Sequence, residues 1–173
     1  MNAGVESLPA AAARPGATRR IEVLDHRDPA VAARILAVLR LAHVQEAALL
    51  GGDASERFTR TVADIQSGDQ FHVGMLDGDD ALVGALALGA DDEPGQICIA
   101  SLVVHPDHQR RGIARSLIDE ARRRVDGAVL SVVTAAVNTP AVNLYESLGF
   151  VAYRRGTMEP GAVRVVKLRQ PGD

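Results

Sequence analysis

The residues best suited to chemistry gather in one basic, glycine-containing turn, Gln109, Arg110, Arg111 and Gly112. An apolar run, residues 99–104, leads into this turn, and apolar residues at helical spacing follow it. The first four N–H groups of a helix lack partners inside it and carry partial positive charge, so phosphate is their natural ligand. Glycine allows close approach of the backbone, and the arginines add fixed charge. The turn therefore predicts an anion site.

The elements that must position this turn follow from the apolar spacing and the turn residues. Helices are expected from Asp28-Pro29 toward residue 50, with a break near His43 left open, and over 54–66, 113–125 and 139–148; strands are expected over 21–24, 70–76, 81–88, 96–104, 128–137, 150–155 and 163–168. Gly51-Gly52 is expected to end the first helix, Asp77 to Asp80 and Glu159 to Gly161 to form hairpin turns, and Thr139-Pro140 to cap the last helix. A strand, helix and strand in succession predict that 96–104 and 128–137 are parallel. The fold class is thus α/β: a mixed, mostly antiparallel sheet with one central parallel pair and flanking helices.

Length and composition narrow the class of protein. The 173 residues predict one domain over 19–170, after a flexible tail over 1–18 that is rich in Ala, Gly and Pro. A net charge of -3, 3% aromatic residues and no Trp argue against nucleic acid as a partner. No apolar run is long enough to span a bilayer, and a single cysteine, Cys98, favours the reducing cytoplasm. The five histidines lack paired ligand spacing, so no metal is expected.

Two motifs in order carry a resemblance to a known family. The turn, Gln109-Arg110-Arg111-Gly112-Ile113-Ala114, resembles the Gln/Arg-x-x-Gly-x-Gly/Ala signature of the GCN5-related N-acetyltransferases (GNAT). Further on, Asn138, Ala141, Tyr145, Gly149 and Phe150 are spaced as in the family's Asn-x-x-Ala-x-x-x-Tyr-x-x-x-Gly-Phe segment. The resemblance implies the acyl-CoA N-acyltransferase fold, in which the two parallel strands splay apart.

The resemblance also implies acetyl-CoA as co-substrate. Its pyrophosphate would lie on the N–H groups of residues 111–114, and its amide-rich arm would pair with the backbone of Leu102 and Val104. A backbone N–H near Leu102 or Val103 would stabilise the oxyanion, and Asn138 would bind the arm. The predicted donor-binding residues are Leu102, Val103, Val104, Gln109, Arg110, Arg111, Gly112, Ile113, Ala114, Arg115 and Asn138.

Two residues are predicted to act in catalysis. The resemblance gives Tyr145 the role of protonating the departing thiolate; the alternative is a core tyrosine with a satisfied hydroxyl. Many relatives carry a glutamate on the strand before the signature, but residues 97–101 contain no carboxylate. Glu46 is the candidate base, with a solvated helix face as its alternative. Cys98 is expected to be a small buried thiol rather than a nucleophile.

The sequence therefore predicts an N-acetyltransferase that moves acetyl from acetyl-CoA to a primary amine of a small molecule or peptide in a ternary complex. The alternative is an acyl-CoA-binding regulatory module with little or no catalysis, which the missing strand carboxylate favours. The acidic loops, 77–80 and 91–93, either draw cationic acceptors or are simply solvated. The acceptor and the oligomeric state, a homodimer included, are left open.

Overall fold

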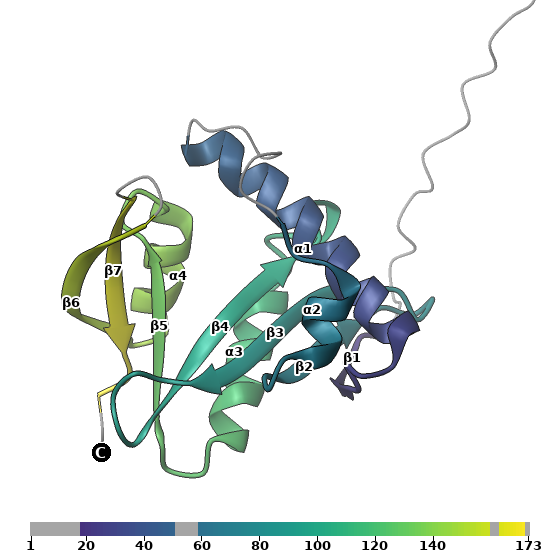
Figure 1. Ribbon diagram of the computed structural model, residues 1–173, viewed down its shortest axis with the longest axis horizontal. Helices are drawn as coiled ribbons and strands as arrows, with labels where there is room; N and C mark the ends of the chain where they lie inside the picture. The colour runs from purple at the N-terminus through teal and green to yellow at the C-terminus, as the bar shows by residue number, and fades with distance from the viewer. Residues whose placement is uncertain (1–17, 51–58, 160–162, 172–173) are drawn as a thin grey trace, which may run out of the picture.

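A single seven-stranded sheet organises the chain, as the computed structural model shows over its described residues, 18–50, 59–159 and 163–171 (Figure 1). The strands are β1 (Arg20–Leu24), β2 (Phe71–Leu76), β3 (Leu82–Ala90), β4 (Gln96–Val104), β5 (Val129–Ala135), β6 (Val151–Met158) and β7 (Val163–Arg169). The helices are α1 (Pro29–Leu50), α2 (Val62–Ser67), α3 (Ile113–Arg124) and α4 (Thr139–Ser147), with a 3-10 turn, η1 (Pro106–His108). The strand order is β1-β2-β3-β4-β5-β7-β6.

The predicted fold class is confirmed, and its central feature is a splay between two parallel strands. β4 and β5 are parallel, and every other neighbouring pair is antiparallel. Their pairing runs only from Gln96 opposite Val129 to Ile99 opposite Val132, although both strands continue. The register of β3 with β4 shifts at this point, so that Ala100 is an extra residue on β4. Figure 1 shows the strands diverging toward the end above which α1 passes.

Capping explains where the helices begin. It corrects two expectations, the start of the helix over 54–66 and the N-cap of the last helix. The Asp28 carboxylate accepts from the N–H groups of Ala30 and Val31, and α1 then continues without a break near His43. The helix expected over 54–66 begins only at Val62, because Thr61 and Asp64 form a capping box. Residues 59–61 are not helical, whereas Gly51-Gly52 and residues 54–58 lie outside the described residues.

The N-cap of α4 is Asn138 rather than Thr139, since its side chain accepts from Ala141 N. Smaller differences concern strand ends: β3 continues to Ala90, β5 is shorter than the run 128–137, and β6 continues to Met158. Most of the tail over 1–18 and the Pro160-Gly161 turn also lie outside the described residues. Among those described, no helix is long and apolar enough to cross a membrane.

Two hydrophobic clusters hold the layers together. The larger packs α3 and α4 against the sheet through residues such as Leu117, Ile118 and Leu86, which are essentially inaccessible. The smaller packs α1 and α2 through Ile35 and Ile65. Each fully buried aliphatic side chain contributes about 1.5–3 kcal/mol, so these clusters fix α3 and α1 relative to the splay.

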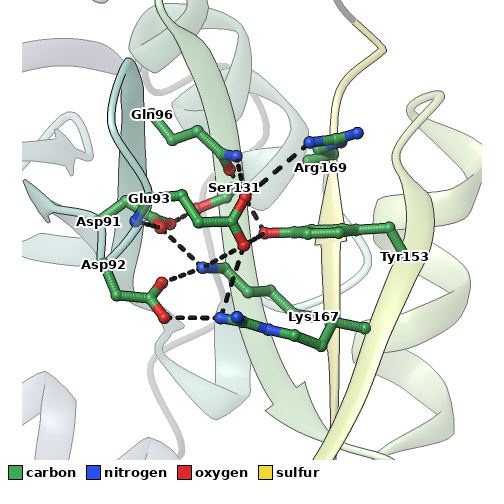
Figure 2. Close-up of polar contacts among 9 residues, drawn as sticks. Asp91, Asp92, Glu93, Gln96, Ser131, Tyr153, Lys167 and Arg169 are labelled. Atoms are coloured by element: carbon green, nitrogen blue, oxygen red, sulfur yellow. Dashed lines mark hydrogen bonds and ion pairs between the residues drawn. The ribbon is translucent and has the colours of Figure 1, made fainter.

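An ionic network around a buried Lys167–Asp91 pair lies at the closed end of the splay, and it shows that Asp91 of the second acidic loop is not simply solvated (Figure 2). Lys167 on β7 is 5% exposed, and its Nζ lies 2.6 Å from an oxygen of Asp91, whose side chain is 1% exposed. Lys167 also binds Asp92, and Tyr153 donates to Glu93 at 2.9 Å. The loop between β3 and β4 is therefore attached to β7, on the far side of β5.

Candidate active site

A cleft of about 900 Å³ passes through the splay. It is lined by the second half of α1, the diverging ends of β4 and β5, the turn before α3, and the start of α4. Of the residues predicted to bind or act, the cleft brings together Glu46, Leu102, Val103, Val104, Gln109, Arg110, Gly112, Ile113, Ala114, Arg115, Asn138 and Tyr145. Arg111 belongs to the turn but does not line the cleft; its carbonyl accepts from Arg19 at 3.2 Å.

The turn before α3 has the backbone geometry of an anion site. Gly112 caps the helix with φ +79°, a left-handed conformation that favours glycine. Ser116 N donates to Gly112 O at 3.0 Å, so the preceding amides of the first turn are those that a helix leaves without an internal acceptor. Arg110 adjoins them, also with positive φ (61°). A methyl group at Gly84 on β3 would lie 2.7 Å from the side chain of Ile113, so the first turn of α3 packs directly against the sheet.

Tyr145 lines the cleft, and its ring is buried. It is 4% exposed, and its ring contacts that of Phe150 edge-on at 5.4 Å between centroids. Burial, followed by the charges of Cys98 and Glu46, raises the pKa of Tyr145. The phenol is therefore protonated at neutral pH.

Glu46 lies across the cleft from β5 and is not simply solvated. Asn138 Nδ2 donates to its carboxylate at 3.1 Å, and both side chains are partly buried. One residue earlier, Gln45 exchanges two hydrogen bonds with Gln109, at 3.2 and 2.5 Å. The second half of α1 is thus attached to the turns that follow β4 and β5.

These attachments were not predicted from the sequence, although Gln45 stands beside the predicted Glu46. The adjacent Gln45 and Glu46 in the second half of α1 were the available signal. Cys98 is partly rather than fully buried and does not line the cleft, and burial raises the pKa of its thiol. His108 does line the cleft, and burial, followed by the charges of Arg111 and His105, lowers its pKa.

Comparison with known families agrees with this geometry. Residues 67–152, which contain β4, the turn, α3 and α4, match the acetyltransferase (GNAT) domain. The chain belongs to the GNAT family.

Among curated proteins, this GNAT chain is 35% identical over 131 residues to UPF0157 protein YqkA of Bacillus subtilis, covering 75% of the chain and 37% of that protein. It is 31% identical over 61 residues to the N-terminal acetyltransferase B complex catalytic subunit NAA20 of Arabidopsis thaliana, covering 33% of the chain and 35% of that protein. The chain thus spans little more than a third of the length of these curated relatives.

Solved structures share the fold at low sequence identity. The ribosomal-protein-S18-alanine N-acetyltransferase of Escherichia coli superposes with a TM-score of 0.67 at 17% identity, over 89% of this chain and 94% of that one. The PaiA N-acetyltransferase of Thermoplasma acidophilum, solved in complex with coenzyme A, gives 0.66 at 16% identity, over 87% and 98%. These likenesses show the acetyltransferase fold of the GNAT chain.

Proposed function

We propose that this GNAT chain transfers acetyl from acetyl-CoA to a primary amine. The observation that carries the proposal is the single cleft, in which the anion-binding turn, the separated edge of β4, Tyr145 and Glu46 all meet. The coenzyme A complex of the Thermoplasma neighbour supports the same donor. The match to a catalytic subunit of an N-terminal acetyltransferase supports catalysis over mere binding.

The residues of the cleft fit the parts of this donor. The N–H groups of Ile113 and Ala114, with the guanidinium groups of Arg110 and Arg115, suit the pyrophosphate. The edge of β4 beyond Ile99 has lost its pairing with β5, so its backbone can pair with the amides of the arm. Within this stretch, an N–H of residues 102–103 is available to the oxyanion.

The chemistry requires one base and one acid. An amine with a pKa near 10 is protonated at neutral pH and has no lone pair. Glu46 accepts this proton, directly or through a water, and the freed amine attacks the thioester carbonyl. A C–N bond forms, the C–S bond breaks, and Tyr145 donates its phenolic proton to the departing thiolate. The nitrogen loses its second proton as the intermediate collapses; this proton restores the Tyr145 phenol, and the proton on Glu46 passes to solvent. The products are the acetylated amine and coenzyme A.

The acceptor is a small-molecule or peptide amine, and the described lining favours one that presents a single cationic nitrogen. Glu46 is the sole carboxylate among the described lining residues. The name of the Arabidopsis relative makes peptide N-termini a component of any acceptor panel.

Thiol release tests the proposal. Purified protein with acetyl-CoA is assayed with a thiol-trapping reagent against amino acids, peptide N-termini, polyamines and aminoglycosides, while calorimetry measures coenzyme A binding. Amine-dependent release with at least one acceptor is expected. Binding of coenzyme A without release from any amine would instead support the regulatory acyl-CoA-binding module. No binding at all would refute both functions.

A further inference from the structure

Asn138 occupies the turn after β5 and makes two hydrogen bonds in different directions. Its Oδ1 accepts from Ala141 N at 3.2 Å and so caps α4. Because a backbone N–H can only donate, this bond fixes the orientation of the side-chain amide. Nδ2 must then face α1, where it donates to Glu46 at 3.1 Å.

An asparagine amide has two hydrogens on its nitrogen, and only one is used by Glu46. The other can donate to a carbonyl of the donor in the same cleft. The bond to Glu46 occupies Oε1 of the carboxylate and leaves Oε2 for another donor, such as an ammonium group. Asn138 therefore connects the donor side of the cleft with the carboxylate on α1.

The need for such a contact follows from the position of Glu46 in the second half of α1. Among the residues of α1 whose burial is described, 29–48, the buried ones are concentrated from Ala32 to Leu39, with Ala47 as the later exception. Packing fixes the first half of the helix more firmly than the second, so polar contacts must hold the carboxylate.

We propose that Asn138 is a positioning residue, which holds the Glu46 carboxylate at the cleft while capping α4. This inference rests on the proposed function, in which Glu46 accepts the proton of the amine. Asn138 acts through Glu46 on the acceptor, in addition to any contact with the donor.

Asn138→Asp separates the two roles of the residue. Aspartate is as good an N-cap as asparagine, so α4 keeps its cap, but it cannot donate and places a like charge beside Glu46. At saturating acetyl-CoA, N138D is expected to lower kcat about 10- to 100-fold, as misplaced catalytic groups do. In an E46Q background the same substitution should have little further effect on kcat. Any change in KM for acetyl-CoA should persist in both backgrounds, because it reports the donor contact.

Three controls keep the inference open to refutation. N138S keeps a side-chain cap on α4 without adding a charge beside Glu46. Urea unfolding checks that each variant folds. Gln45→Ala removes the neighbouring attachment of α1; a kcat loss as large as that of N138D would show that any attachment suffices and would overturn the inference. An equal loss of kcat from N138D with and without E46Q would also overturn it. Absence of thiol release by the wild-type protein would instead refute the proposed function.

Discussion

Lys167→Met tests whether the network at the closed end of the splay is a main source of stability. The substitution keeps the length of the side chain and removes its charge. Asp91 would then be a carboxylate that is 1% exposed, with Ser131 as its remaining side-chain donor among the described contacts. Removing one partner of a buried ion pair costs about 3–5 kcal/mol, which is a large part of the 5–15 kcal/mol typical of a domain.

The pKa shifts of the pair agree with this expectation. Burial alone would raise the pKa of Asp91, but hydrogen bonds from Lys167 and Ser131 outweigh it and hold the pKa well below its usual range. Burial alone would lower the pKa of Lys167, but Asp91 and Asp92 raise it overall. Both groups are thus more strongly ionised in the folded state than in the unfolded chain. The stability they supply is complete between about pH 4 and pH 10 and declines outside this window.

Urea unfolding at pH 7, followed by circular dichroism, measures the cost. Two comparisons isolate the buried charge. Arg154→Met removes an exposed partner of Asp92 and should cost less than about 1 kcal/mol. The double variant K167M/D91N removes the stranded charge and should recover most of the loss. A cost below about 1 kcal/mol for K167M, or no recovery in the double variant, would refute the reasoning.

Three further predictions concern the cleft and the fold. Tyr145→Phe should lower kcat about 100-fold and leave the Kd for coenzyme A within about twofold, measured by thiol release and calorimetry; unchanged kcat would remove Tyr145 from the mechanism. Gly84→Ala should place a methyl group 2.7 Å from Ile113, cost about 1–3 kcal/mol and raise KM for acetyl-CoA, whereas Gly156→Ala, with nothing within 4 Å, should do neither. Burial, with His26 and Arg60, lowers the pKa of His72 to about 4. Between pH 6.5 and 4 the unfolded chain therefore binds more protons, and unfolding should become easier by up to about 3 kcal/mol as the pH falls; in His72→Phe this part of the pH dependence of urea unfolding should disappear.

The elements were predictable wherever their signals are local. The strand 96–104 was predicted with its observed bounds and the helix opening at Gly112 with its observed start, because apolar spacing and one left-handed glycine mark them. The helix over 54–66 was predicted to begin too early, because helical spacing outweighed the capping box at Thr61. The order of β7 and β6 beside β5 is not encoded in any single segment, and it emerges only from long-range packing.

The same difference between local signals and long-range contacts applies to the two sides of the candidate site. The side proposed to bind the donor is built from two short segments, 102–115 and 138–145, so the turn and the Tyr145 segment could be identified from motifs. Its other side depends on pairings over long separations: 64 residues between Gln45 and Gln109, and 92 between Glu46 and Asn138. Lys167 and Asp91 likewise stand 76 residues apart. In the sequence, the acidic run and the lysine of β7 were each compatible with solvation, and only the folded sheet brings their charges together.

The position of Asn138 has a consequence for how donor and acceptor chemistry are related in this chain. A residue of the donor motif caps α4 and also holds the carboxylate proposed as base, so one side chain serves both halves of the cleft. A relative with a glutamate on the strand before the turn would not need this contact, because its base would be fixed by the sheet. In this chain the carboxylate lies on a helix whose second half is held by polar contacts. Substitutions at the Asn138 contact should therefore alter catalysis more than they alter the fold.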